Sequence, residues 1–597
     1  MFILTLASPM YGLLAVAFLV PLGHLLAVLM DQEAFRLSEA FVLAFLAAWV
    51  LRPHAYRSGP RLPAAGASLL AATIIASIAA QMWLLRQYPG ELTRTVEGLL
   101  HDYYRVGGRP ALVEGARLLE GLALMTATVV QFRQRPALAV KLPAALAASA
   151  TVAALASVLL WRGIGPTAVL AEHAKIGYRV SAHVADVNAA GSYFVLSLCA
   201  VLGMAARTRA GTRTAWWAAV IACAVGLWLA GSRSAIGAAA IVLPLAGAWL
   251  LTVRWTPTTR FAVLSGLLVL SLAAGTARTR QAERDPTYRG RGFRQQFNAT
   301  SLRMIGARPL FGVGIGQYYD TSPLFLSPQL AWTYGHENAH NYFLQLAAEL
   351  GLVGFAVFAA WIGLNLAVIG RALARAPRDM RLLGAAAGII ALIGTSTTGH
   401  PLLVNEVAFP FWILFGLTVA LAGLTLVNSS RPLDAPRTAH ERVGWPLTAA
   451  AGIVLSLAAA MSARTGPLRA PISPAVTGFY EWETDGDGRR FRWTSEYASL
   501  FVPRNVKRIR VPVRLPLVHR PIAPMGVEVA VGGMVQSRSL ALERWSTIDI
   551  VLTQMEGPAL FTRVDLRVDQ VWRPALYVAG SADMRSVGVQ VGEYEMH

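Results

Sequence analysis

The chain has 597 residues, of which 55% are hydrophobic and 14% are charged, with a mean hydropathy of +0.48 and a formal net charge of +20. This composition excludes a soluble globular enzyme and a disordered chain as descriptions of the whole sequence, and it predicts a protein that lies mostly in a membrane. Both cysteines, Cys199 and Cys223, lie within apolar segments, so no disulfide framework is predicted.

Apolar segments long enough to cross a bilayer recur from the N-terminus to about residue 462. A hydrocarbon core of about 30 Å needs about 20 mostly apolar residues in a helix, and about thirteen segments meet this requirement. In chain order they are 9–30, 37–51, 65–86, 111–130, 142–160, 189–206, 215–230, 235–252, 261–277, 340–369, 382–398, 402–427 and 445–462. The sequence therefore predicts a mostly α-helical, polytopic membrane domain over residues 1–464.

Arginine residues mark alternate short loops between these segments. They follow the second, fourth, sixth, eighth, tenth and twelfth spans, for example at Arg52, Arg133 and Arg371. Because basic residues are retained on the cytoplasmic side, these loops and the N-terminus are predicted to be cytoplasmic. With an odd number of spans, the part after residue 464 would lie on the outer side of the membrane.

One predicted outer loop, residues 278–339, is long and strongly basic. It has eight arginines, including Arg291 and Arg294, against four acidic residues. The planar guanidinium group suits phosphate. The loop is therefore interpreted either as a site for a phosphate-containing ligand or as an attachment to anionic lipid head groups.

Beyond residue 464 the pattern changes to short segments in which polar and apolar residues alternate, such as 508–515, 527–531 and 563–568. Because glycine, proline and aspartate separate these segments, they predict an all-β sandwich over residues 465–597. Its tryptophans are candidates either for stacking on sugar rings or for filling the core. They are Trp482, Trp493, Trp545 and Trp572.

The densest group of polar residues lies at the start of the tenth predicted span. The pattern there begins at His340 and reads His-Asn, nine residues, Gly, two residues, Gly. Upstream lie a Pro-Leu-Phe-Gly-Val-Gly-Ile-Gly segment at 309–316, a Gly-Ser-Arg turn that ends at Arg233, and an Asp-Val-Asn turn at 186–188. With these motifs in this order, residues 186–425 resemble the O-antigen ligase and O-antigen polymerase family.

The resemblance implies a GT-C-like membrane glycosyltransferase of the bacterial inner (plasma) membrane. Such an enzyme moves a glycan from an undecaprenyl-pyrophosphate carrier to an acceptor hydroxyl on the outer side. The acceptor would be the lipid A core in a ligase, growing polysaccharide in a polymerase, or a protein hydroxyl, and the motifs do not distinguish these three. A flippase for lipid-linked glycans and a carrier of small anions are the alternatives of another class, since they also have many spans and a basic cavity.

Glycosyl transfer with inversion needs a base for the incoming hydroxyl and positive charge for the departing pyrophosphate. The motif places His340 at a helix N-terminus, where the helix dipole disfavours the imidazolium and keeps the ring a neutral base. Arg233 and one loop arginine, Arg294 or Arg291, would bind the pyrophosphate. The other candidates for substrate contact are polar neighbours of the histidine, namely Asn341, His336 and Glu337.

The segment that carries these motifs has no Asp-x-Asp pair and no glycine loop for a nucleotide phosphate. The arginines would take the place of a divalent cation. A metal-independent reaction without a cofactor is therefore expected, with lipid-linked glycan and the bilayer as partners and no nucleic acid.

Ionisable residues also occur within the predicted spans. Glu349 in the tenth span is expected to face a polar cavity or an internal partner. Three ionisable residues lie on one helical face of the fourth span, namely Glu114, Arg117 and Glu120. They are expected either to line the same cavity or to pair with each other. The motif glycines Gly351 and Gly354 are expected to permit close helix packing.

Overall fold

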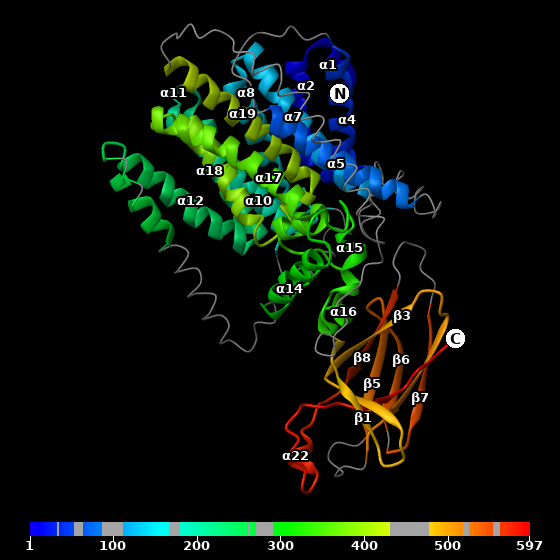
Figure 1. Ribbon diagram of the computed structural model, residues 1–597. Coiled ribbons are helices and arrows are strands. Elements are labelled where there is room, and N and C mark those ends of the chain that lie inside the picture. The colour runs from blue at the N-terminus through cyan, green and yellow to red at the C-terminus, as the bar shows by residue number, and fades with distance from the viewer. Residues whose placement is uncertain are drawn as a thin grey trace.

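The computed structural model describes residues 1–32, 35–52, 64–85, 111–165, 179–208, 210–256, 258–260, 262–269, 291–429, 477–516, 524–541, 543–552 and 561–597, and all structural statements refer to these residues. Figure 1 shows a bundle of helices from the first 429 residues and a set of β-strands after residue 476. The N-terminus lies at the end of the bundle that is farther from the strands. The prediction of a mostly helical chain with a C-terminal β region is confirmed.

Helices account for every described element of the first part. The elements up to residue 251 are α1 (Phe2–Ala7), α2 (Pro9–Leu19), η1 (Val20–Leu22), α3 (Gly23–Leu29), α4 (Leu37–Leu51), α5 (Ala64–Leu85), α7 (Ala111–Gln134), α8 (Leu138–Trp161), α10 (Val187–Arg207), α11 (Ala210–Ala230) and α12 (Arg233–Leu251). The later elements are α14 (Arg291–Ala307), α15 (Tyr318–Thr321), η2 (Ser322–Leu324), α16 (Pro328–Tyr334), α17 (Tyr342–Arg375), α18 (Met380–Thr395), η3 (Pro401–Leu403) and α19 (Asn405–Ser429).

Eight helices in the described part are long and apolar enough to span a membrane. They are Pro9–Leu29, Gly66–Trp83, Leu138–Trp161, Val187–Arg207, Gly211–Ala230, Arg233–Leu251, Tyr342–Arg375 and Asn405–Val427. Three shorter apolar helices coincide with further predicted spans, namely Leu37–Leu51, Thr258–Val269 and Met380–Thr395. The predicted fourth span is α7, which carries several charged residues, and the predicted last span lies outside the described residues. The count of about thirteen, the GT-C-like arrangement and the domain boundary at 464/465 stay predictions.

Helices α10 and α19 are almost completely buried in the bundle, and glycines allow α10 to approach α18 closely. A Cβ added at Gly203 on α10 would lie 2.3 Å from the Met380 carbonyl oxygen. One added at Gly384 on α18 would lie 2.6 Å from the Cys199 carbonyl oxygen. The two helices therefore pack backbone to backbone where the last turns of α10 meet the first turns of α18.

Helix α17 is broken near its start, a feature that the apolar pattern does not indicate. Gly351 adopts a left-handed backbone conformation with φ 69°, and the segment 309–316 runs beside this break, where Leu352 N donates to Pro309 O at 2.7 Å. A Cβ at Gly351 would lie 2.2 Å from the Leu310 carbonyl oxygen of this segment. Gly351 therefore permits a backbone break and not helix packing, whereas Gly354 lies against a side-chain methyl group of α5 as expected.

The described part of the basic loop is folded. Its elements α14, α15 and α16 lie between the helix bundle and the β-strands (Figure 1). The Tyr318 and Ser301 hydroxyl groups are 2.7 Å apart, and Arg303 Nε donates to the Phe325 carbonyl oxygen at 2.9 Å. Met304, Tyr318 and Phe325 are fully buried. This loop therefore has a core of its own, which positions the residues that precede α17.

The C-terminal region contains two antiparallel sheets. Their strands are β1 (Phe479–Thr484), β2 (Arg490–Thr494), β3 (Tyr497–Pro503), β4 (Arg508–Arg514), β5 (Met525–Val531), β6 (Met534–Ala541), β7 (Ser546–Val551), β8 (Phe561–Val568), β9 (Gln590–Gly592) and β10 (Glu595–Met596), with a short helix α22 (Pro574–Tyr577). One sheet has the order β1-β2-β9-β4-β10, with β7 also paired to β4, and the other has the order β3-β8-β5-β6. Apolar residues of both sheets form one buried cluster between them, as expected of a sandwich.

The four tryptophans of this region differ in burial. Trp493 and Trp572 belong to the buried cluster, and Trp572 Nε1 donates to the Gly588 carbonyl oxygen at 3.0 Å. Trp545 is partly buried, while Trp482 is 37% exposed. Only the latter two remain candidates for stacking on sugar.

Candidate active site

His340 lies directly before α17 in an unusual backbone conformation. Its φ of 49° is in the left-handed region, and only Asp31 shares a positive φ among the described non-glycine residues. Such strain is kept where surrounding contacts enforce it, often at functional sites. The ring contacts Phe297 of α14 and His400 of the turn before η3, with centroid distances of 4.7 and 5.1 Å. Its side chain is 36% exposed, so that a small hydroxyl group can reach it.

The surroundings of His340 favour its neutral form. Partial burial lowers the pKa of the ring below its ordinary value, and electrostatic interactions with His400 and Arg294 lower it further. Burial is the main cause of the lowered pKa, and it favours the neutral state expected from the motif. A neutral imidazole near pH 7 is able to accept a proton.

Asn341 and the next turn fix the start of α17. The Asn341 side-chain oxygen accepts hydrogen bonds from Phe343 N and Leu344 N, each at 3.2 Å, so Asn341 is the N-cap of the helix. Tyr342 N donates to the Ser396 carbonyl oxygen at 2.9 Å. These contacts fix the first turn of the helix, and the predicted substrate contact of Asn341 stays a prediction.

Two of the predicted arginines belong to one positively charged group. Arg233 is the first residue of α12, after Gly231 with φ 56°, and Arg294 lies in α14; both side chains are exposed. Burial is the main cause that lowers the pKa of Arg179; Asp186 raises it, and the charges of Arg233 and Arg294 lower it further. Arg294 also acts on His340. Arg291 begins α14, but its side chain lies outside the described residues, so the choice between Arg294 and Arg291 stays open.

Arg179 is a third member of this group that the motifs do not indicate. Its Nε donates to the Ala230 carbonyl oxygen at 3.1 Å, and its Nη2 donates to Asn188 Oδ1 at 2.7 Å. The side chain lies across the turn at Gly231, where an added Cβ would be 3.2 Å from Arg179 Cγ. No spacing rule connects Arg179 with Arg233, because the contact joins segments 51 residues apart.

His400 and Asp186 adjoin the same place. Asp186 caps α10 by accepting from Asn188 N at 2.8 Å, and its Oδ2 lies 3.9 Å from His400 Nε2. The His400 ring also contacts the His340 ring in a tilted arrangement, with an interplanar angle of 49°. The Asp-Val-Asn turn was noted as a family feature, whereas no motif pointed to His400.

The two polar residues before the motif have different neighbours. Glu337 Oε1 lies 3.8 Å from His340 Nε2, and burial raises the pKa of the Glu337 carboxyl group. The His336 ring stacks on Tyr319 at 5.4 Å, and burial lowers the pKa of His336. Glu337 is therefore within reach of the candidate base, whereas the observed ring contact of His336 is with the loop.

Comparison with protein families identifies the segment that carries most of this geometry. Residues 218–359 match the family model described as O-antigen ligase. This match assigns the segment to the O-antigen ligase family. The predicted family is thereby confirmed. A comparison with curated proteins finds no match.

The ligase-family segment includes Arg233, Arg294 and His340, whereas Arg179 precedes it and His400 follows it. The site is therefore built partly from residues outside the matched range. They reach it because α10 and the turn after α18 lie next to the start of α17.

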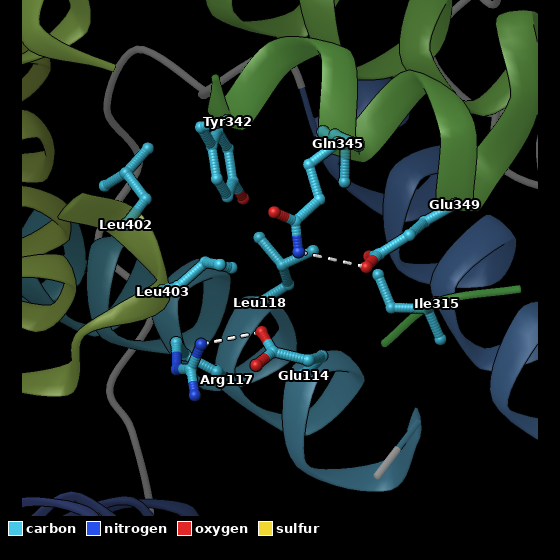
Figure 2. Close-up of a pocket in the computed structure, with 10 residues that line it drawn as sticks. Glu114, Arg117, Leu118, Ile315, Tyr342, Gln345, Glu349, Leu402 and Leu403 are labelled. Atoms are coloured by element: carbon cyan, nitrogen blue, oxygen red, sulfur yellow. Dashed lines mark hydrogen bonds and ion pairs between the residues drawn. The ribbon is translucent and has the colours of Figure 1, made fainter. Parts of the chain in front are cut away.

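A small pocket lined by both ionisable and apolar side chains lies beside the ligase-family motif (Figure 2). Its lining residues are Glu114, Arg117, Leu118, Ile315, Tyr342, Gln345, Leu346, Glu349, Leu402 and Leu403. Glu349 and two of the three fourth-span residues thus share a cavity as expected, and Arg117 also pairs with Glu114 at 2.6 Å. Glu120 is not among the lining residues. The pocket has room for about one water molecule, so it does not hold a sugar.

Gln345 connects this pocket with the ligase-family loop. Its Nε2 donates to Asn338 Oδ1 at 3.1 Å and to Glu349 Oε1 at 3.2 Å. Ala339 N donates to Gln345 Oε1 at 3.4 Å. The buried residues below the loop therefore hold its backbone just before His340.

One acidic residue outside the ligase-family segment, Asp485, has structural partners. The tail contains an Asp-x-Asp pair that the motif region lacks, Asp485 and Asp487, in the turn between β1 and β2. Asp485 accepts from Asp487 N and Arg489 N, and it pairs with Arg514 at 3.1 Å. Asp485 is thus occupied in closing a hairpin. The metal independence of the reaction stays a prediction.

Proposed function

We propose that this chain is a membrane glycosyltransferase that transfers a glycan from an undecaprenyl-pyrophosphate carrier to an acceptor hydroxyl, with inversion and without a metal ion. The family match supports an O-antigen ligase-like or polymerase-like membrane function. The observation that carries the finer proposal is the gathering of Arg179, Arg233 and Arg294 beside a histidine whose surroundings favour the neutral form.

The three arginines suit a pyrophosphate group. Besides burial, the charges of Arg233 and Arg294 lower the pKa of Arg179, and an anion that binds among the three groups relieves this repulsion. Guanidinium groups also donate hydrogen bonds in pairs to phosphate oxygens. The arginines would hold the donor in the ground state and stabilise the charge that develops on the leaving group.

In the proposed reaction His340 removes the proton from the acceptor hydroxyl while its oxygen attacks the anomeric carbon. The bond from that carbon to the phosphate oxygen breaks, and its electron pair leaves with undecaprenyl pyrophosphate. The Glu337 carboxyl group, 3.8 Å from His340 Nε2, is placed to stabilise the imidazolium that forms. A single displacement of this kind inverts the configuration of the anomeric carbon.

The proposed setting is the bacterial inner membrane, with the site and the β region on the outer side and the N-terminus in the cytoplasm. The alternating arginine loops support this orientation. The N-terminus and the β-strands also lie at opposite ends of the bundle (Figure 1). The acceptor would be lipid A core or growing polysaccharide.

A reconstitution experiment tests the proposal. Purified protein in nanodiscs is incubated with an undecaprenyl-pyrophosphate glycan, with or without lipid A core, and the products are separated by size. A ligase glycosylates lipid A core, whereas a polymerase lengthens the donor without it. If neither product forms, but vesicles containing the protein move the glycan lipid across the bilayer, the chain is a flippase and the proposal is wrong.

A further inference from the structure

The β region rests directly on the folded part of the basic loop (Figure 1). Strands β3 and β8 contact α16, and β8 also contacts η2. The turn between β5 and β6 meets Gly335, at the end of α16. The contacted loop elements end just before His340, so this interface lies next to the candidate active site.

Arg563 on β8 is the central polar residue of the interface. It is 6% exposed, and its Nε pairs with Asp565 Oδ1 at 2.9 Å within the β region. Its Nη1 donates across the interface to the Pro323 carbonyl oxygen at 2.9 Å and also to the Leu326 carbonyl oxygen. A buried arginine that satisfies backbone carbonyls of a different segment is costly to remove, because those carbonyls would lose their partners.

Apolar and backbone contacts surround this arginine. Phe501 and Phe561, from β3 and β8, pack against the loop core that contains Tyr318 and Phe325. At the β5–β6 turn, a Cβ added at Gly533 would lie 3.1 Å from the backbone nitrogen of Gly335. A methyl group at Gly533 would therefore require the backbone at Gly335 to shift.

The loop transmits this contact to the site. On the other side of the turn that Arg563 holds, Arg303 of α14 donates to the Phe325 carbonyl oxygen. The same helix carries Arg294, and its Phe297 ring lies 4.7 Å from His340. The turn at 323–326 is thus held from one side by the β region and from the other by the helix that carries two residues of the site.

We propose that the C-terminal β region is a clamp that holds the loop helices α14 and α16 in the position in which Arg294 and His340 form the transferase site, with Arg563 as a positioning residue. The inference rests on the proposed function. It concerns a region outside the ligase-family segment and does not require the β region to bind sugar. Small displacements of catalytic groups lower rates strongly, so the clamp contributes to the rate without touching substrate.

Two variants of the full-length protein in nanodiscs test the clamp. Arg563→Met removes the donors to the loop carbonyls, and Gly533→Ala adds a methyl group against Gly335. We expect each to increase hydrogen exchange in residues 322–335 and to lower kcat about 10-fold or more, with undecaprenyl-pyrophosphate glycan as donor. Arg563→Lys, which retains a donor, should recover part of the rate.

Each variant has a matched control in the β region. Arg585→Met also removes an arginine with two acidic partners, Asp583 and Glu483, which lie within the β region. Gly532→Ala places the same strain at φ 63° in the same turn, but its Cβ meets nothing within 4 Å. Both controls should keep wild-type exchange in residues 322–335 and wild-type kcat.

Unchanged exchange in Arg563→Met and Gly533→Ala would overturn the clamp, and so would increased exchange with unchanged kcat. If Arg563→Met failed to fold, Gly533→Ala would decide by the same criteria. If the wild type transferred no glycan, the proposed function would fail independently. Hydrogen exchange would then test only whether the β region holds the loop in place. Unchanged exchange in both variants would still overturn the clamp.

Discussion

Two substitutions of His340 separate the loss of a base from the strain of its backbone. His340 has φ 49°, a conformation that costs alanine about 1–2 kcal/mol but that asparagine tolerates. His340→Ala therefore removes the base and adds strain, whereas His340→Asn removes the base with little strain. Neither substitution touches Arg179, Arg233 or Arg294, so donor affinity should remain close to that of the wild type.

The expected loss is large because no other group occupies the position of the ring. The loss of a general base lowers a rate by about 10²- to 10⁴-fold, or about 2.7–5.4 kcal/mol of barrier. Strain of about 1–2 kcal/mol accounts for at most about a 30-fold loss. Both variants should therefore fall by at least about 100-fold, with alanine equal to or below asparagine.

The assay measures initial transfer rates in nanodiscs at saturating donor and acceptor, together with equilibrium binding of labelled donor. An asparagine variant that kept more than about a tenth of the wild-type rate would refute general-base catalysis by His340. In that case a poor alanine variant would reflect only a distorted loop. Loss of donor binding in both variants would instead place the histidine in the donor site.

Three further predictions concern the arginines, the pH dependence and the tryptophans. Arg233→Lys and Arg294→Lys should each lower transfer activity about 10-fold or more, because a point charge does not replace a bidentate guanidinium group. EDTA should leave the activity of the wild type unaffected. Full activity of both variants, or an activity loss in EDTA that magnesium restores, would indicate a metal-bridged donor. Because burial and neighbouring positive charge lower the pKa of His340, its ring should stay neutral as the pH falls through the ordinary histidine pKa of about 6.5. The acid limb of the kcat/KM profile should therefore lie below that pH. An acid limb at or above it would contradict the assigned environment of His340. Trp572→Ala should destabilise the β region by about 3–5 kcal/mol, measured by its thermal transition. Trp482→Ala should leave that transition unchanged and weaken binding of the host's polysaccharide. Equal polysaccharide binding by the wild type and Trp482→Ala would exclude Trp482 as a sugar contact.

Short-range patterns in the sequence determined the helices, the strands and the central motif of this protein. Apolar length predicted helices that the structure contains, and alternation predicted the strands, because both patterns depend on which face of a local element is buried. The motif around His340 indicated the family, and the Gly-Ser-Arg turn indicated Arg233. Each of these features is contained within a few consecutive residues or within one helix.

Tertiary structure alone decided which distant groups meet. Arg179 and His400 reach the site across contacts that no spacing rule describes, since they depend on how α10 and α18 pack through their glycines. The break at Gly351 is likewise visible only with segment 309–316 beside it. The hydrogen bonds of Arg563 to loop carbonyls 237 and 240 residues away likewise depend on the tertiary structure. Such contacts form where surfaces of separately folded elements fit together, and that fit depends on all the side chains between them.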